Sequence, residues 1–377
     1  MIRFTSFYSA LRLTGVSLVV LCLLLSGVGI SSITSDNPPL LALDIPIGES
    51  CTIFTATIGN RVLFGNNEDY RLWGIFAWFV PAQTIRLYTG DESVYGAIFF
   101  GFDENGDVAD GYPQGGMNDQ GLCMDGNGLG PYTINAHSER EPPSCALLAQ
   151  VLWECATVDE VEAWFLTHTI GSSMNYQLHY ADATGDALVV SAGSDHEIAF
   201  TRIGSNSCLV STNINVADPS RDVYDCWRYS TAMAMLTGIS SESALTVEAC
   251  RDVLNAVHQD GTYATKYSNV FDCVTRDVYL WYNRDYSHIT AFNLDTELAA
   301  VQSGVAGFQE NDPLFGAFTV NGDIHYRKVA ITDLLGSNNP IQPIHLLLFT
   351  IAILAIVITI TAMVLYRRKR KTLDAVT

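Results

Sequence analysis

The sequence has few basic residues for its length. Lys and Arg together number 20 against 40 Asp and Glu, which gives a formal net charge of −20 at pH 7. The densest basic cluster, residues 367–371, stands at the extreme C-terminus, so the remaining chain is more acidic still. A surface of this sign repels nucleic acid. We therefore expect no nucleic-acid partner.

Motifs that hold metals or build repeats are also missing. The sequence contains no Cys-x-x-Cys pair, no Cys/His cluster and no two His at the i, i+4 spacing of a metalloprotease helix. It contains no low-complexity tract and no self-similarity at the spacing of a solenoid. We expect neither a metal nor a cofactor, and a single large domain in the middle of the chain.

Two long apolar runs flank that middle part. The first, LTGVSLVVLCLLLSGVGI, follows Arg3 and Arg12 and precedes the small residues Ser31 and Ser32. This pattern is typical of a secretory signal peptide. Because the run is somewhat long for a signal, an uncleaved N-terminal anchor is the alternative for residues 1–32.

The second run, residues 346–366, carries no charge and is long enough to cross a bilayer as a helix. The five cations that follow it favour a cytoplasmic tail at residues 367–377, and a buried core helix rarely ends in this way. Gly, Ser, Asn and Pro cluster before it and predict a linker over residues 334–345. The sequence thus predicts a single-pass protein of the cell membrane whose middle part faces outward.

Cysteine is the next informative residue type, with nine in the chain. Cys22 lies in the first apolar run, and Cys51 heads a stretch that is discussed below. The other seven are Cys123, Cys145, Cys155, Cys208, Cys226, Cys250 and Cys273. Disulfides are permitted outside the cell, but this wide spacing fixes no connectivity, and the odd number predicts at least one unpaired Cys.

Periodicity predicts an α+β fold, with strands first, helices in the middle and strands again. The predicted strands cover 51–58, 61–66, 187–192, 197–203, 277–283, 287–293 and 317–328. The predicted helices cover 144–155, 157–168, 225–237 and 247–258. Thr157 and Glu160 form a capping box at the start of the second helix.

One stretch, CTIFTATIGNRVLFGNNEDY at residues 51–70, calls for a functional explanation. It predicts a hairpin that turns at Ile58–Arg61 and places Cys51 beside the polar end of the second strand, Asn66–Asp69. A structural disulfide is the ordinary role for such a Cys. A lipoprotein anchor is excluded, because Cys51 lies too far beyond the apolar run.

Cys51 in this position suits an N-terminal nucleophile. If the Ser50–Cys51 peptide bond is broken, Cys51 gains an α-amine with a pKa of about 8. That amine can serve as the base for its own thiol, and Asp69 would hold and orient it. Residues 33–50 would then be a pro-segment, removed autocatalytically, since signal peptidase is not expected to cut so far from the apolar run.

Four segments together resemble the choloylglycine hydrolase/penicillin V acylase family of linear-amide C–N hydrolases, within the N-terminal-nucleophile superfamily. They are CTIF with LFGNNEDY, then GMNDQGLCMDGNGLG at 116–130, CLVSTNINVADP at 208–219 and CWRYSTAMAML at 226–236. The resemblance implies a four-layer αββα sandwich over residues 51–333 and cleavage of a small-molecule N-acyl amide through an acyl-thioester. Because oligomers are common in that family, it also implies a homo-oligomer.

The resemblance further implies catalytic roles for five residues. Cys51 would be the nucleophile, and Asp69 would bind its α-amine. Asn213 would donate to the oxyanion, helped by the loop around Asn127. Arg228 would stabilise the site electrostatically and favour the thiolate. Each of the last three has an ordinary alternative: a left-handed turn for Asn127, a loop cap for Asn213 and the surface of an amphipathic helix for Arg228.

Substrate contacts are expected from Asn66 and Asn67, and from Trp73 and Phe76 in the aromatic run YRLWGIFAWFVP. That run would line a pocket for an apolar acyl group. Core packing and contact with the membrane surface are its alternatives.

Two departures keep other activities open. Bile-salt and penicillin acylases usually carry an Arg at the position of Asn66, so those two substrates are in doubt. The triplet Asn67–Asp69 also resembles that of N-terminal-Cys dipeptidases. The alternatives are therefore a dipeptidase or acyltransferase of the same superfamily, or a non-catalytic membrane-tethered binding module in which Cys51 forms a disulfide.

Overall fold

The computed structural model describes residues 51–71, 74–87, 90–102, 112–204, 207–219, 226–304 and 324–335. The predicted signal or anchor, pro-segment, transmembrane helix and basic tail lie outside these residues, as do Trp73 and nearly all of the linker. Within the described ranges, no helix has both the length and the apolar character needed to cross a membrane. The predicted membrane topology lies outside the described residues and therefore stays a prediction.

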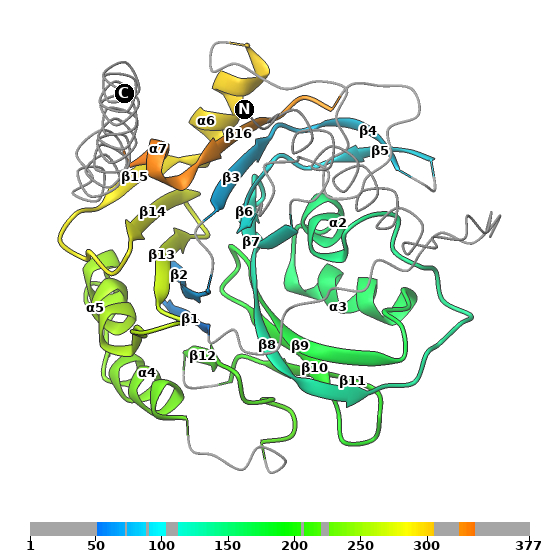
Figure 1. Ribbon diagram of the computed structural model, residues 1–377, viewed down its shortest axis with the longest axis horizontal. Coiled ribbons are helices and arrows are strands. Elements are labelled where there is room, and N and C mark those ends of the chain that lie inside the picture. The colour runs from blue at the N-terminus through cyan, green and yellow to red at the C-terminus, as the bar shows by residue number, and fades with distance from the viewer. Residues whose placement is uncertain are drawn as a thin grey trace, which may run out of the picture. The chain divides into compact units, whose positions relative to one another are not determined.

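Two antiparallel sheets form the centre of the described domain (Figure 1). Sheet A has the strand order β12-β1-β2-β13-β14-β15, and sheet B has the order β11-β10-β9-β8-β7-β6-β3-β16. The strands of sheet A are β1 (Thr52–Ile58), β2 (Arg61–Asp69), β12 (Cys208–Ser211), β13 (Thr265–Asp272), β14 (Asp277–Tyr282) and β15 (Thr290–Asn293). Those of sheet B are β3 (Ile75–Val80), β6 (Ala97–Phe102), β7 (Tyr112–Asn118), β8 (Cys123–Thr133), β9 (Ser173–Ala181), β10 (Ala187–Ala192), β11 (Ile198–Arg202) and β16 (Arg327–Ala330). A separate hairpin joins β4 (Gln83–Leu87) to β5 (Gly90–Val94).

Three of the described helices begin where a polar side chain accepts from one of the first backbone N–H groups. At the start of α3, Thr157 accepts from the Glu160 N–H, and the Glu160 carboxylate accepts from the Thr157 N–H, which confirms the predicted capping box. Thr246 caps α5 in the same way, and Asn293 caps α6. The described helices are α2 (Leu147–Glu154), α3 (Val158–Thr167), α4 (Trp227–Thr237), α5 (Val247–Val257), α6 (Leu294–Gln302) and α7 (Ile331–Leu334).

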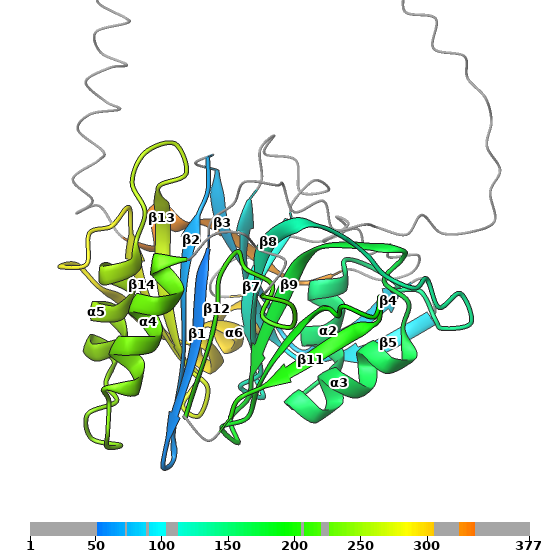
Figure 2. The same ribbon diagram turned by 90° about the horizontal axis from the view of Figure 1, so that it is seen from below.

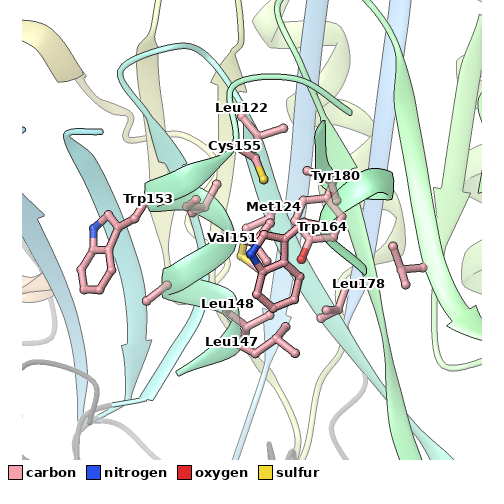
Figure 3. Close-up of a cluster of buried hydrophobic side chains, with 14 of the residues drawn as sticks. Leu122, Met124, Leu147, Leu148, Val151, Trp153, Cys155, Trp164, Leu178 and Tyr180 are labelled. Carbon is pink, nitrogen blue, oxygen red and sulfur yellow. The ribbon is translucent and has the colours of Figure 1, made fainter. Parts of the chain in front are cut away.

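Three apolar clusters hold four layers together, with α4 and α5 on one side of the paired sheets and α2 and α3 on the other (Figures 1 and 2). Between the sheets, the ring of Phe100 from sheet B stacks on that of Phe271 from sheet A, with centroids 6.0 Å apart. Figure 3 shows the outer face of sheet B, where Leu148 of α2 packs near Met124 and Leu178. This layering matches the predicted α+β sandwich.

The structure contains all four predicted helices, as α2 to α5, and six predicted strands, as β1, β2, β10, β11, β14 and β15. Most of the predicted strand 317–328 lies outside the described residues. Much of sheet B was not predicted, nor were β12, β13 and α6. The aromatic run is one reason, because Ile75–Val80 forms β3, a strand buried on both faces. Such strands lack the alternation of apolar and polar residues that identifies a half-buried strand.

Candidate active site

Cys51 lies directly before β1, at the end of the first hairpin of sheet A. The two-residue turn at Gly59–Asn60 fixes the register, so Thr52 pairs with Asn67. One step further along the hairpin, Cys51 lies opposite Glu68, and its thiol donates a hydrogen bond to Glu68 Oε1 at 3.5 Å. The predicted hairpin is therefore confirmed, and it brings a fully buried thiol against a carboxyl group.

Arg228, in the first turn of α4, reaches the start of β1. Its guanidinium donates to the Cys51 carbonyl oxygen at 2.7 Å, to Thr52 Oγ1 at 3.0 Å and to Asn213 Oδ1 at 2.8 Å. Arg228 is only 4% exposed, which excludes the alternative of a surface residue. The side chain thus fixes both the backbone of Cys51 and the amide of Asn213.

Asn213 follows β12, the strand that pairs with β1 on the side away from β2. Its Nδ2, the group expected to donate to an oxyanion, donates here to the carbonyl oxygen of Gly128 in β8, at 2.8 Å. Asn127 is the neighbour of Gly128 and is completely buried. Within the described part of the chain, neither Nδ2 nor Oδ1 of Asn127 has a hydrogen-bond partner. The structure therefore places Asn127 in a strand rather than in a left-handed turn.

Asp69 ends β2 and is completely buried. Its carboxylate accepts from Thr265 Oγ1 at 2.5 Å and from Gln259 Nε2 at 3.1 Å, and it lies 3.8 Å from Nη1 of Arg228. Burial raises the pKa of Asp69 to about 7, although the hydrogen bond from Thr265 and the charge of Arg228 oppose that rise. Arg228 thus links Asp69 to Cys51, and the described contacts include no direct bond between the two.

Glu68 and Asp125 form a buried acidic pair beside the thiol, and neither was predicted as a site residue. Burial raises the pKa of Glu68 to about 8, and the charge of Asp69 raises it further, against hydrogen bonds from Asn66 and Cys51. Burial raises the pKa of Asp125 well above its ordinary range, and the charge of Glu68 adds to the effect. Glu68 therefore holds its proton near neutral pH and can donate a hydrogen bond.

The predicted substrate-binding residues fall into different places. Asn66 lies in the site, where its Nδ2 donates to Glu68 Oε2 at 3.4 Å. Asn67 points to the opposite face of sheet A and donates to the carbonyl oxygen of Leu254 in α5 at 2.8 Å, which is a structural contact. Phe76 packs against the cluster on the outer face of sheet B, with the Lys328 ammonium 4.3 Å from its ring centroid. Its role in substrate binding stays a prediction that this position does not favour.

A buried histidine joins the two sheets close to this site. His179 of β9 lies between Thr55 Oγ1 at 3.0 Å and Ser211 Oγ at 2.9 Å. Burial lowers its pKa to about 3, so it is neutral at physiological pH and its role is to hold β1 and β12 against sheet B. Within the described ranges, no three His, Cys, Asp or Glu residues are grouped so that they could hold a metal ion.

The arrangement suits acyl transfer to a thiol. The candidate nucleophile, Cys51, has the Glu68 carboxyl against its thiol and the Arg228 guanidinium on its carbonyl oxygen, and the same guanidinium holds the amide of Asn213. Contacts join Cys51 through Arg228 to Asp69 and Asn213, and through Asn213 to the strand that carries Asn127.

The pairing register of the hairpin is the signal that identifies Glu68 from the sequence. Once the turn is placed at Gly59–Asn60, each pair of residue numbers in the hairpin sums to the same value, and Cys51 is matched with Glu68. No comparable signal identifies Asp125, because it reaches the site from the other sheet.

No family model and no curated protein sequence matches this chain significantly. Solved structures do match its fold. Two are variants of the conjugated bile acid hydrolase from Clostridium perfringens, one at 14% identity and TM-score 0.52, covering 72% of this chain and 97% of that one. The other has 12% identity and TM-score 0.51, covering 66% of this chain and 93% of that one.

A penicillin V acylase from Agrobacterium tumefaciens also matches, at 18% identity and TM-score 0.49, over 62% of this chain and 83% of that one. At these identities the comparisons establish the fold alone, and the two hydrolase structures carry that conclusion. The described chain has the mixed α/β fold of conjugated bile acid hydrolase, and the resemblance to the choloylglycine hydrolase/penicillin V acylase family is confirmed at the level of fold.

Proposed function

We propose that this protein is an amide hydrolase in which Cys51 is an N-terminal nucleophile that cleaves a linear N-acyl amide through an acyl-thioester. The observation that supports the proposal is the contact chain from Cys51 through Arg228 to Asn213, built on a fold shared with a bile acid hydrolase. Cys51 and Arg228 are buried and Asn213 is partly buried, so a change in one of these side chains alters the hydrogen bonds of the others.

The reaction begins once the Ser50–Cys51 bond is broken. The free α-amine takes the thiol proton, and the thiolate attacks the carbonyl carbon of the amide. The oxyanion receives hydrogen bonds from the amides of Asn213 and Asn127. The ammonium, held by Asp69, then gives its proton to the departing amine. Water attacks the thioester, the α-amine again takes the proton, and the acid leaves with Cys51 restored.

The proposal also covers the processing of the enzyme and its location in the cell membrane. Residues 33–50 are a pro-segment, residues 346–366 anchor the chain in the cell membrane, and the hydrolase domain faces outward. The support for this setting is the sequence pattern alone: two apolar runs, and a basic cluster after the second.

Thioester trapping tests the chemistry. Purified full-length protein in detergent is mixed with a panel of N-acyl 4-nitroanilides, and the intact mass is recorded after rapid acid quenching, which preserves thioesters. We expect turnover and an acyl adduct on a peptide that contains Cys51. A Cys51→Ala variant should show neither, while Cys145→Ala, which removes a buried thiol from the core beside α2, should show both.

The alternatives give different results in the same assay. A non-catalytic binding module shows no adduct and no loss on mutation of Cys51. An acyltransferase forms the adduct but releases it faster when a second amine is added. A dipeptidase of the same superfamily forms the adduct only from dipeptides, whose leaving amine carries a free carboxylate.

A further inference from the structure

The Glu68 carboxyl lies against the Cys51 thiol, and Asp125, from the other sheet, interacts electrostatically with Glu68. Glu68 of β2 and Asp125 of β8 are each 1% exposed. In the described part of the chain, neither forms an ion pair with Lys, Arg or His. Glu68 accepts from the Cys51 thiol at 3.5 Å and from Asn66 at 3.4 Å, and Asp125 accepts from the N–H of Gly126 at 2.7 Å. Burial of two acids in this state is costly unless a further group compensates it.

The chain makes room for the second carboxyl. Asp125 pairs in register with Gly115 of β7, and a Cβ atom at Gly115 would collide with the Asp125 carboxylate. Only glycine at that position lets the carboxyl occupy the inner face of sheet B. The acidic pair is therefore accommodated by a specific feature of the neighbouring strand.

Polar groups with no partner surround this pair. The hydroxyl of Tyr267, which lies opposite Glu68 in register, is buried and makes no hydrogen bond within the described ranges. Burial raises the pKa of this hydroxyl well above its usual range, and the charges of Glu68, Asp125 and Cys51 add to the effect. The side-chain amide of Asn269, the next inward residue of β13, is also without a partner in the described chain. A buried polar group without a hydrogen-bond partner destabilises the protein by about 1–3 kcal/mol. A ligand that bonds these groups would remove that cost.

The sign of the charge decides which ligand fits. The Arg228 guanidinium is engaged by the Cys51 carbonyl oxygen, Thr52 and Asn213, and lies beside Asp69. An anionic substrate group would raise the pKa of both carboxyl groups further, whereas an ammonium would lower it, so that an ionised carboxylate accepts the N–H donors of the ammonium.

The distance from Glu68 to the Cys51 thiol indicates which carbon of the substrate carries this ammonium. A carbonyl carbon in position for attack lies about 3–3.5 Å from the sulfur, and Glu68 Oε1 lies 3.5 Å from the same atom. An ammonium on the carbon next to that carbonyl is therefore within hydrogen-bond reach of the Glu68 carboxyl. The aromatic run that would have supplied an apolar acyl pocket is β3 of the core, which removes the argument for a purely apolar acyl group.

We propose that Glu68 and Asp125 bind a primary ammonium on the carbon next to the scissile carbonyl, so that the substrate class is α-aminoacyl amides. This inference rests on the proposed amide hydrolysis at Cys51. It identifies Glu68 and Asp125 as specificity-determining residues, with Tyr267 and Asn269 as further hydrogen-bonding groups around the acyl substituent.

An isosteric substrate pair tests the inference. Alanine 4-nitroanilide and isobutyric 4-nitroanilide differ only in an ammonium against a methyl group. With the full-length protein at pH 6.5, where an α-amine is mostly protonated, we expect kcat/KM to favour the alanine compound by at least about 30-fold, the contribution of one charge-assisted hydrogen bond. In Glu68→Gln and in Asp125→Asn this ratio should fall at least tenfold. Glu154→Gln removes a carboxyl on α2, away from the site, and should leave the ratio unchanged.

The outcomes separate this inference from the proposed function. Hydrolysis of both compounds at similar rates, with the ratio unaffected in the two variants, overturns the ammonium site and keeps the amide hydrolase. If neither compound is hydrolysed, thermal unfolding decides: alaninamide must raise the Tm of the wild-type protein more than isobutyramide does, and this advantage must shrink in Glu68→Gln. An equal effect of the two amides overturns the inference.

Discussion

Replacement of Glu68 by Gln should change how the stability of the protein depends on pH. The folded pKa of Glu68 is about 8, against an ordinary value of 4.5, chiefly because the carboxyl is buried. The folded state therefore holds this proton more tightly than the unfolded chain does. Its stabilising effect is complete below pH 4.5 and is lost as the pH rises to about 8, since the unfolded chain ionises freely and the folded protein cannot.

The magnitude follows from the two pKa values. One pKa unit corresponds to about 1.4 kcal/mol, so the interval from 4.5 to about 8 is worth about 5 kcal/mol. Part of this passes to Asp125, whose own pKa is raised by the charge of Glu68. Only the part of this effect that falls between pH 5 and pH 8 is measured, which is at most about 3.5 kcal/mol. We therefore expect the wild type to lose between about 2 and 3.5 kcal/mol more stability than Glu68→Gln between these two pH values. At pH 5 the two should differ by less than about 1 kcal/mol, because Gln and protonated Glu have nearly the same shape and donors.

Urea unfolding of the full-length protein in detergent, followed by Trp fluorescence at pH 5, 6.5 and 8, measures this difference. Glu154→Gln is the control, and its curve should run parallel to that of the wild type. Parallel curves for wild type and Glu68→Gln would refute the reasoning, since the carboxyl would then be titrating as if exposed.

Three further predictions concern the network around the site. Asn213→Ala should lower kcat about 10²–10³-fold in the nitroanilide assay, as loss of an oxyanion donor does, and an unchanged kcat would exclude that role. Arg228→Lys keeps the charge but cannot make the three-way contact, so kcat/KM should fall at least about tenfold, with thermal unfolding recorded to exclude global loss of structure. Cys123 and Cys273 have their sulfur atoms 3.5 Å apart, so oxidised glutathione should link them in a disulfide that peptide mapping detects; two free thiols after prolonged oxidation would contradict this.

Local patterns predicted the local parts of the site. The turn signal at Gly59–Asn60 and the alternation on both sides of it were sufficient to place Cys51 beside the end of β2. The Thr157–Glu160 capping box likewise predicted the start of α3, because both features depend on residues only a few positions apart. The contacts that complete the site were not accessible in this way.

The two sheets meet through residues that are far apart in the chain. Asp125 approaches Glu68 only because β8 faces sheet A, and β8 was not recognised as a strand, since its glycines favour loops. β3 was not recognised because both of its faces are buried. Phe76 was expected near the substrate for the same reason: an aromatic run does not reveal which of its residues face which layer.

The mature N-terminus of the protein tests the central claim most directly. Protein expressed in membranes is purified in full-length form, and its N-terminus is determined by intact mass and terminal sequencing beside a Cys51→Ala variant. The account predicts a wild-type chain that starts at Cys51 and a variant that retains residues 33–50. A wild-type chain in which Cys51 stays internal would contradict it, because the thiol would then lack the α-amine that acts as its base.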